Sequence, residues 1–535
     1  MIVPITVAEA LKKHVALIVE CIDRMYLNVY IPKLQSEPGV VGFFRNHRGA
    51  IFASSSLMEP ISRAFVSSIQ AFIKKRQIPV VRFAKNQRKD DVAKEYLARF
   101  KGEEGVLFVG VAQEKAYVFS TEKRRNPQTG LTYPWIVRSK RMVNYYYFYC
   151  VDRDFGPFFI KFCSYFPYSG KLCINGHEYV KRQLDQEGIG YTPLDNGIAT
   201  CDNPERLQQI CDGLDARTIE ALFTKWLDIL PQPLTQEDRN AGYQYQLSVL
   251  QAEFSLTLML DRPLTGRKFF ECLIKDNLII GRPDNVQLIF ERRITKRTPG
   301  RFRTRIITEG VIPSLHLDYK HSRIKIYFKE GRALRIETTI NNTKDFGIGK
   351  RLTNLSLLRN IGFAANRRVM EVQRLTEDPT LALDTLKTMS EPLIVNGVRT
   401  SALPFANQST QDLLQALPIF RLQANGFANK DLRDHLAGIA GKNPDQISLG
   451  QMSYKLRRLR LRGLIERMPK SHRYRVTDFG LRVATFYTVA YNRMLQPGLT
   501  AALGAGVHND NRLAAAFNTL QKAMDHHASM LKIAA

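Results

Sequence analysis

The sequence lacks the features of a membrane-spanning, secreted or disulfide-stabilised protein. It contains no run of about 18 apolar residues, the length that a transmembrane helix needs. Its seven cysteines form no C-x-x-C pair, which argues against both a zinc ribbon and a disulfide framework. The opening residues, M-I-V-P-I-T-V-A-E-A-L-K-K-H, lack the basic-then-apolar order of a signal peptide. We therefore expect buried thiols, no zinc, no membrane partner and a cytoplasmic location.

Several catalytic signatures are also missing. There is no G-x-x-x-x-G-K-[ST] phosphate-binding loop, so no nucleotide cofactor is expected. There is no G-x-S-x-G nucleophile elbow and no H-E-x-x-H zinc motif. A hydrolase or ATPase built on any of these motifs is therefore excluded.

Acidic residues are few relative to basic ones. Asp and Glu number 50 against 78 Lys and Arg, which gives a formal net charge of +28 and a pI of about 9.8. Such a surplus repels itself unless a polyanion screens it. Because the positive charge is clustered along the chain, we expect the partner to be a nucleic acid, DNA or RNA.

The densest cluster lies within residues 291–305, E-R-R-I-T-K-R-T-P-G-R-F-R-T-R. Its basic residues alternate with Ile, Thr and Phe around Pro299-Gly300, a dipeptide typical of turns. This pattern predicts a basic β-hairpin that contacts phosphates. The residues expected to bind are Arg292, Arg293, Lys296, Arg297, Arg301, Arg303 and Arg305.

A chain of 535 residues is too long for one core, and the length favours three or four domains. Alternating strand and helix patterns predict an α/β domain at the start of the chain. Strands are expected over 14–30, 79–83 and 105–111, helices over 60–76, 90–100 and 176–187, and two strands around 152–157. The predicted order is an α/β domain (1–195), a helical segment (196–280), a basic β-rich segment (281–375), a connector (376–412), a small helical domain with a strand pair (413–500) and a C-terminal helix (501–535).

The C-terminal part carries the most specific pattern. A short helix is expected from Asn429, a second helix over 448–465, and a strand–turn–strand over 466–477. This order resembles a winged helix–turn–helix domain, which implies that the second helix enters the major groove and that the wing flanks it. The cations assigned to these two elements are Lys455, Arg457, Arg458, Arg460, Arg462, Lys470, Arg473 and Arg475. Winged helices also serve as protein-docking modules, and the C-terminal helix is a candidate for homodimerisation.

Asp152 and Asp154 follow a strongly aromatic strand, Y-Y-Y-F-Y-C-V-D-R-D. Carboxylates at strand ends are where two-metal nucleases and transposases of the ribonuclease-H type hold Mg²⁺. Asp23 lies within the first predicted strand and is expected to approach them. The alternative is a turn, Asp-Arg-Asp-Phe-Gly-Pro, with exposed acids paired to Arg153.

A second candidate site is Asn175-Gly176-His177-Glu178, where Asn-Gly predicts a tight turn. His177 would then stand at a strand-to-helix junction as a catalytic acid, base or metal ligand. Helix capping by Asn175 and a surface salt bridge from Glu178 explain the same residues.

The third candidate lies in residues 316–340, where alternation predicts strands with Arg323, Lys325, Arg335 and Glu337 on one face. This strand pair resembles part of the replication initiators of phages and plasmids. The resemblance implies that Glu337 helps to hold a metal and that Tyr327 is a candidate nucleophile. The paired-histidine motif of that family is missing. The alternative is a basic sheet surface that tracks phosphates without catalysis.

Two hypotheses follow. The first is a Mg²⁺-dependent nucleic-acid-processing enzyme of nuclease, nickase, transposase or replication-initiator type, with Asp23, Asp152, Asp154, His177 and Glu337 as catalytic residues and Asp152, Asp154 and Glu337 as metal ligands. The second is a non-catalytic DNA- or RNA-binding clamp or regulator.

Overall fold

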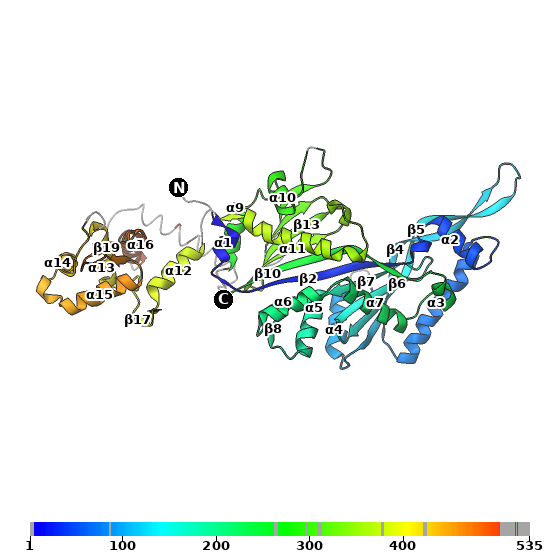
Figure 1. Cartoon of the computed structure of the whole chain (residues 1–535), viewed down its shortest axis with the longest axis horizontal. Coiled ribbons are helices and arrows are strands. Elements are labelled where there is room, and N and C mark those ends of the chain that lie inside the picture. Colours follow the sequence, from blue (N-terminus) through cyan, green and yellow to red (C-terminus); the bar gives the residue numbers. More distant parts are fainter. Residues whose placement is uncertain are drawn as a thin grey trace. The chain divides into compact units, whose positions relative to one another are not determined.

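The computed structural model describes residues 5–84, 87–261, 266–295, 297–307, 313–375, 379–420 and 425–502, together with residues 519 and 522. The chain divides into two compact units, unit 1 (residues 1–378) and unit 2 (residues 379–535) (Figure 1). The predicted C-terminal helix falls mostly outside the described residues. Among the described helices, none has both the length and the apolar character needed to cross a membrane.

Unit 1 is built on one mixed sheet, whose strand order is β11-β12-β13-β14-β10-β2-β7-β6-β5-β4-β3. Only the edge pair β3–β4 is parallel among the pairs of this sheet. The strands are β2 (Val15–Tyr30), β3 (Val80–Arg82), β4 (Gly105–Arg125), β5 (Thr132–Asp152), β6 (Gly156–Cys163), β7 (Gly170–Asn175), β10 (Gln246–Leu260), β11 (Phe302–Ile307), β12 (Ser314–Tyr319), β13 (Ser322–Lys329) and β14 (Ala333–Ile340). The prediction of a mixed α/β chain is confirmed, and strands from 1–195, 196–280 and 281–375 share this sheet.

Smaller strands form two further pairs in unit 1, and helices cover the large sheet. The small strands are β1 (Ile5–Thr6) with β15 (Arg374–Leu375), and β8 (Tyr191–Leu194) with β9 (Gly197–Cys201). The helices are α1 (Val7–Leu11), α2 (Glu37–Gly42), α3 (Ser55–Arg76), α4 (Lys89–Arg99), α5 (Gly176–Gln186), α6 (Pro204–Gly213), α7 (Ala216–Ile229), α8 (Gln236–Asn240), α9 (Gly266–Asp276), α10 (Pro283–Phe290) and α11 (Leu355–Val372). Most helices and strands expected over the first 187 residues are present.

Local hydrophobic patterns explain the two central strands. In β2 the even-numbered positions after Val15 are largely exposed or half-buried, whereas Val19, Met25 and Leu27 are buried, as the β-branched and apolar alternation predicts. Strand β10 lies inside residues 196–280, which were expected to form a helical segment. Its alternating run Q-L-S-V-L-Q-A-E-F-S-L-T-L-M-L has the period of a strand, so the helical expectation is wrong for Gln246–Leu260.

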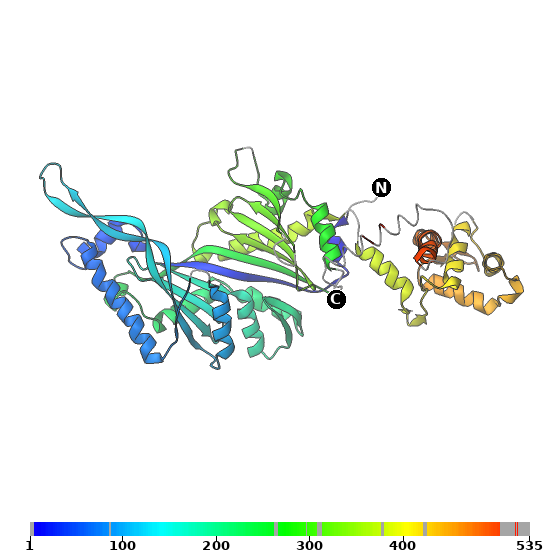
Figure 2. The same ribbon diagram turned by 180° about the vertical axis from the view of Figure 1, so that it is seen from behind.

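Helix α11 packs against one face of β10 and β14. Gly362 of α11 lies directly over Phe254 of β10, where an added Cβ would come within 2.3 Å of the Phe254 ring. The Asn366 amide donates to the Phe254 carbonyl at 2.9 Å, and the Thr338 hydroxyl donates to the Asn366 carbonyl oxygen at 2.6 Å. Figure 2 shows the opposite face of strands β10 to β14 turned to the viewer, with α11 behind the sheet.

Strands β4 and β5 continue as a long hairpin, which we call the arm (residues 115–142) (Figure 1). Its base packs on the body of unit 1, where the Phe119 backbone N–H donates to the Phe166 carbonyl at 3.2 Å, and its end extends beyond the body. Their register runs without a break from Lys115↔Met142 to Arg125↔Thr132. At the tip the Asn126 amide N–H donates to the Leu131 carbonyl at 2.8 Å, and Gly130 adopts a φ of +68°. The strand expected over 105–111 is therefore confirmed, but it is three times longer than the sequence pattern indicates.

Unit 2 is a small helical unit with two short strand pairs. Its elements are α12 (Pro379–Ser390), β16 (Leu393–Val395), β17 (Val398–Thr400), α13 (Gln408–Phe420), α14 (Asn429–Ile439), α15 (Leu449–Leu461), β18 (Ile465–Arg467), β19 (Tyr474–Val476), α16 (Asp478–Ala490) and α17 (Gln496–Ala502). Ser448 and Gln451 form a capping box that starts α15, and Gly463, with a φ of +71°, follows its last turn. The helices and strands expected over 429–477 are present.

Candidate nucleic-acid interface

Three of the predicted catalytic residues gather around Arg335, which is completely buried. The Arg335 guanidinium donates to Asp23 Oδ2 at 2.7 Å and to Glu337 Oε1 at 2.8 Å. It also lies 2.9 Å from His177 Nε2 and donates to the Asn196 carbonyl at 2.5 Å. These contacts join β2, β14, α5 and the β8–β9 turn into one polar cluster under the sheet.

The charges in this cluster compensate one another. Burial alone would raise the pKa of Asp23, but the Arg335 guanidinium, His177 and Asn196 together hold it well below its usual range. Burial raises the pKa of Glu337 against the attraction of Arg335. Burial and the Glu337 carboxylate raise the pKa of Tyr327, which donates a hydrogen bond to Glu337 at 2.8 Å. A phenol held in this way is a poor nucleophile, and the two carboxylates are committed to a guanidinium.

His177 is placed by helix capping at the start of α5. The Asn175 side chain accepts from the His177 backbone N–H at 2.9 Å, and Glu178 pairs with Lys181 at 2.9 Å. The geometry matches the capping and surface-pair alternative for these residues. His177 is 1% exposed, so it faces the Arg335 cluster and not solvent.

Asp152 belongs to a different set of contacts. Its Oδ2 accepts from Lys225 Nζ and from the Trp226 indole N–H, both at 2.8 Å, and its Oδ1 accepts from the backbone N–H groups of Asp154 and Phe155. Burial works against these donors, which together lower the pKa of Asp152. The Asp154 carboxylate accepts from Gln186 at 3.0 Å.

The five predicted catalytic residues thus divide between the Arg335 cluster and the β5–β6 turn. Over the ranges that the structure describes, no group of three or more His, Cys, Asp or Glu side chains is placed to share a metal ion. The assignment of Asp152, Asp154 and Glu337 to one Mg²⁺ site stays a prediction that metal titration can test.

The predicted basic hairpin over 292–305 is wrong in its pairing. Residues 302–307 form β11, but they pair with β12 (Ser314–Tyr319), and 292–295 and 297–301 are irregular. Pro299 cannot donate a ladder hydrogen bond, and the Arg292 side chain instead donates to the Phe346 carbonyl at 3.2 Å. Lys296 lies outside the described residues. Arg293, Arg297 and Arg301 remain exposed.

The face of β11–β13 opposite α11 is nevertheless basic. It carries Arg303, Arg305, Arg323 and Lys325, with one carboxylate, Asp318, that accepts from both Arg303 and Arg305 at 2.7 to 2.9 Å. Burial and then the cations Arg305, Lys325 and Arg323 lower the pKa of His316, beneath them, to about 4. With four cations against one carboxylate, this face carries a surplus of positive charge.

The cations of α15 fall into two groups that the sequence did not separate. Arg462 is 3% exposed and donates to the carbonyls of Glu391 and Ser401 at 2.9 and 2.7 Å. Arg458 donates to the Ala402 carbonyl, and Lys455 to the Ser409 hydroxyl at 3.2 Å. Arg458 and Arg462 thus face the segment before α13, and Lys455 meets the first turn of α13. Arg462 is therefore not on the exposed side of the helix, where a duplex would be met. Arg457 and Arg460 are exposed.

The cations of the β18–β19 hairpin likewise divide into those bound within unit 2 and one that is exposed. Arg473 donates to the carbonyls of Asn425 and Gly426 at 2.7 and 2.8 Å, which ties the hairpin to the loop before α14. Arg475 pairs with Glu466 on the neighbouring strand at 2.5 Å. Lys470 stands exposed in the turn between the strands with a φ of +53°.

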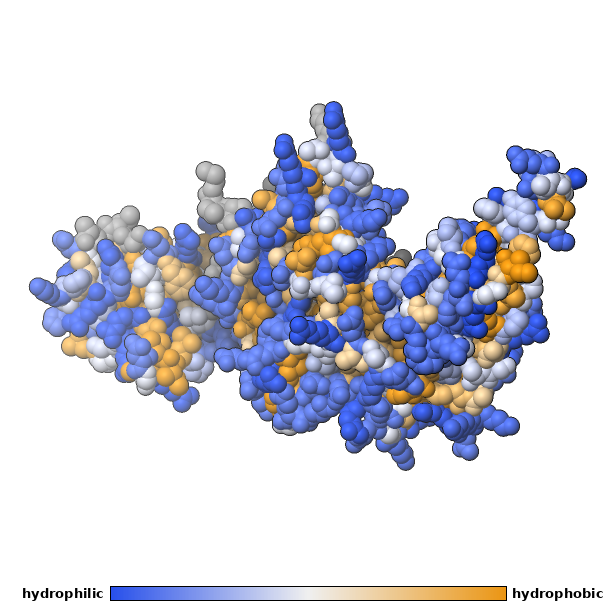
Figure 3. Space-filling view, turned by 45° about the vertical axis from the view of Figure 1, so that its right-hand side comes forward, coloured by the Kyte–Doolittle hydropathy of each residue, from blue (hydrophilic) through white to orange (hydrophobic). Residues whose placement is uncertain are grey.

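The arm carries exposed cations that the sequence patterns did not single out as a candidate interface. Between residues 115 and 142 it exposes cations at seven positions and a carboxylate at one, Glu122. The cations are Lys115, Lys123, Arg124, Arg125, Arg138, Lys140 and Arg141. Figure 3 shows the end of the arm standing clear of the body of unit 1, with a mostly hydrophilic surface around an apolar spot. The signal in the sequence was the turn N-P-Q-T-G between two basic, aromatic runs.

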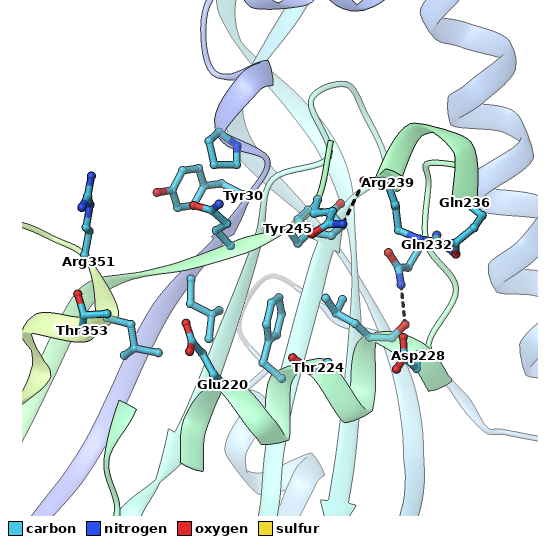
Figure 4. A pocket seen from close by; sticks show the side chains of 17 residues that line it. Tyr30, Glu220, Thr224, Asp228, Gln232, Gln236, Arg239, Tyr245, Arg351 and Thr353 are labelled. Carbon is cyan, nitrogen blue, oxygen red and sulfur yellow. Dashed lines mark hydrogen bonds between the residues drawn. The ribbon is translucent and has the colours of Figure 1, made fainter. Parts of the chain in front are cut away.

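A cavity of about 800 Å³ lies elsewhere in unit 1, between α7 and the strands β2 and β10 (Figure 4). Tyr30 and Tyr245 line one side, and Glu220 and Asp228 project from α7 on the other. Two arginines also line it: Arg239, which donates to the Leu234 carbonyl and to Gln236, and Arg351. Because the two carboxylates offset the two arginines, the cavity wall has no surplus of positive charge, and we leave it out of the interface.

No protein-family model, no curated protein and no solved structure matches this chain.

Proposed function

We propose that this chain is a nucleic-acid-binding protein, and that it holds its partner through cations of both units. The observation that carries the proposal is the arm, where seven exposed cations face solvent with one exposed carboxylate. Seven cations on a slender two-stranded ribbon repel one another in the free protein. Phosphates relieve that repulsion and release their own counterions, which is the main source of affinity for nucleic acids.

The basic face of β11–β13 supports the same function. Arg303, Arg305, Arg323 and Lys325 outnumber the one carboxylate of these strands, Asp318, so the face carries a surplus of positive charge. Backbone-positioning contacts of this kind fix the register of a nucleic acid without reading its sequence.

Unit 2 is proposed to be a winged helix–turn–helix module. Helices α14 and α15 and the β18–β19 hairpin follow one another in that order, with Met452, Leu456 and Leu459 of α15 in the core. The exposed side of α15 then presents Arg457 and Arg460 to a duplex, and Lys470 extends from the wing. Winged-helix modules also bind proteins, so a protein partner is the alternative for this unit.

The contacts of the predicted catalytic carboxylates favour binding of a nucleic acid over its cleavage. The Asp23 and Glu337 carboxylates already bind Arg335, and Asp152 binds Lys225 and Trp226. A Mg²⁺ site built on these residues would have to displace these donors first. We therefore propose the non-catalytic clamp, with the Mg²⁺-dependent processing enzyme as the alternative.

The test is fluorescence anisotropy with labelled duplex and single-stranded oligonucleotides over a range of salt concentrations. We expect submicromolar binding at low salt and a steep loss of affinity as salt rises. Arg457→Ala with Arg460→Ala should weaken duplex binding, whereas Arg482→Ala, an exposed cation of α16, should not. Absence of binding to any oligonucleotide at low salt would refute the proposed function. Unchanged duplex affinity in the α15 variant would assign unit 2 to a protein partner.

A further inference from the structure

The arm combines its cations with exposed aromatic rings. Trp135 is 43% exposed, Tyr133 is 37% exposed and Tyr117 is 56% exposed, although aromatic side chains of this size are usually buried in a soluble protein. All three stand on the two strands of the arm: Tyr133 and Trp135 lie toward its end, and Tyr117 lies at its base, between the buried Ala116 and Val118. Nothing in the fold requires rings at these positions, since their exposed faces contribute little to the core.

Trp135 and Tyr117 each already lie against a cation. The Arg124 guanidinium lies over the Trp135 ring, 4.6 Å from its centroid, and Tyr133 meets the same indole edge-on at 6.2 Å. Tyr117 is flanked by Arg138 at 5.1 Å and by Lys140 at 5.9 Å. A cation over one part of the ring system fixes its orientation and leaves the rest of the exposed surface open.

We propose that the arm binds single-stranded nucleic acid by stacking unpaired bases on Trp135 and on Tyr117, with phosphates held by the neighbouring cations. This inference rests on the proposed nucleic-acid binding and specifies its ligand. Exposed aromatic rings beside cations are what single-strand-binding surfaces use, because every base offers a π-face and every linkage a phosphate. A base inside a duplex is already stacked on its neighbours, so duplex DNA cannot use these rings without unpairing.

The arm provides two separate stacking sites. Trp135 is opposite Glu122 and Tyr117 is opposite Lys140 in the register, so the two rings are five residues apart along β4 and lie on opposite faces of the ribbon. At the rise of an extended strand this is roughly 17 Å. Sites this far apart act independently, so the effects of substituting the two rings should multiply.

The chain offers its own probe for this site. Its two tryptophans are Trp135 and Trp226, and Trp226 is 1% exposed with its indole N–H bonded to Asp152. Quenching of tryptophan emission by a bound oligonucleotide therefore reports Trp135. In Trp135→Phe the remaining emission comes from Trp226 and should not respond, while the phenyl ring keeps much of the stacking.

The experiment titrates the full chain with an unlabelled single-stranded oligonucleotide, with the matching duplex, and with anionic phospholipid vesicles. We expect quenching of Trp135 emission with the single strand and little with the duplex. By anisotropy, Trp135→Ala and Tyr117→Ala should each weaken single-strand binding roughly 5- to 150-fold, and the double variant by about the product of the two. Phe486→Ala, which removes an exposed ring of unit 2 (65% exposed), should leave it unchanged.

The outcomes separate this inference from the proposed function. Single-strand binding that survives both arm substitutions, with unchanged Trp135 emission, would overturn the stacking sites and leave nucleic-acid binding in place. Equal losses of affinity for the single strand and the duplex would also overturn the stacking sites. Such losses would indicate that the substitutions displaced the cations of the arm, because a duplex does not stack on the rings. A blue shift with vesicles and no response to oligonucleotides would assign the rings to a lipid surface. No binding to any nucleic acid would remove the proposed function itself.

Discussion

Replacement of Arg335 by Met should destabilise unit 1 by an amount that depends on pH. The substitution keeps most of the volume and removes the donors that bind Asp23, Glu337 and the Asn196 carbonyl. Removing one partner of a buried ion pair costs about 3 to 5 kcal/mol, because the other charge stays buried without compensation. The low end applies here, since Asp23 keeps the Asn196 amide and Glu337 keeps Tyr327 and is partly exposed.

The magnitude can be converted to a melting temperature. Unit 1 spans 378 residues, and the entropy of unfolding is about 2.1 cal/mol/K per residue, or about 0.8 kcal/mol/K in all. A loss of about 3 kcal/mol then lowers the Tm by about 4 °C. Both tryptophans lie in unit 1, so thermal unfolding followed by tryptophan emission reports this unit. Arg323→Met, the same change at an exposed position of the adjacent strand, should shift the Tm by less than about 1 °C.

The pH dependence follows from the Asp23 carboxylate. Its pKa is lowered in the folded protein, so the stabilisation it supplies is complete above the unfolded pKa of about 3.9 and is lost as the pH falls through the folded value. In the Met variant the buried carboxyls have no guanidinium, so their pKa values should rise and protonation at mildly acid pH should relieve them. The Tm difference should therefore be largest near pH 7 and shrink toward pH 4. A difference under about 1 °C at pH 7, or one that does not change with pH, would refute this account of the cluster.

Three further predictions concern single side chains. Asp152→Asn should lower the free energy of unfolding of unit 1 by about 2 kcal/mol, because it weakens the contacts with Lys225 and Trp226, and it should leave oligonucleotide affinity unchanged. If the wild-type chain cleaves labelled DNA or RNA with Mg²⁺ and this variant does not, the metal-site hypothesis is restored. Arg462→Ala should destabilise unit 2 by about 1 to 3 kcal/mol, whereas Arg460→Ala should change its stability by no more than about 0.5 kcal/mol, both measured by far-UV circular dichroism. Equal effects would contradict the division of these cations into a buried and an exposed group. Gly362→Ala should destabilise the packing of α11, since its Cβ would overlap the Phe254 ring, and a neutral result in chemical denaturation would show that the ring can move aside.

Local periodicity was enough to predict many elements of the fold. The β-branched run over 14–30 gave β2, and the helical spacing over 60–76 gave most of α3. The same reasoning failed for β10 and for the pairing of 302–307, because strand partners are set by residues distant in the sequence. The arm was missed because the outer part of β4, T-E-K-R-R, is polar on both faces and has the composition of a loop, although the turn signal that follows it was present.

Side-chain roles were harder to predict than elements. Alternation placed Arg335 on the same face as Arg323 and Lys325, which is correct, but its burial depends on Asn196 and His177 from distant segments. Likewise, helical periodicity cannot show that Arg462 meets the carbonyls of Glu391 and Ser401 while Arg457 faces solvent. Whether a cation is available to a phosphate is decided by such long-range packing.

The salt dependence of single-strand binding tests the central claim most directly. Alanine in place of Lys123, Arg124 and Arg125 removes three cations from the tip of the arm, and alanine in place of Lys74, Lys75 and Arg76 removes a matched triplet from the end of α3. For single strands the slope of log Kobs against log salt is about −0.7 per phosphate neutralised. The arm variant should therefore bind more weakly at low salt, with a slope smaller in magnitude by about 2, and the α3 variant should match the wild-type chain. An unchanged affinity and slope in the arm variant would contradict the claim that the arm binds nucleic acid.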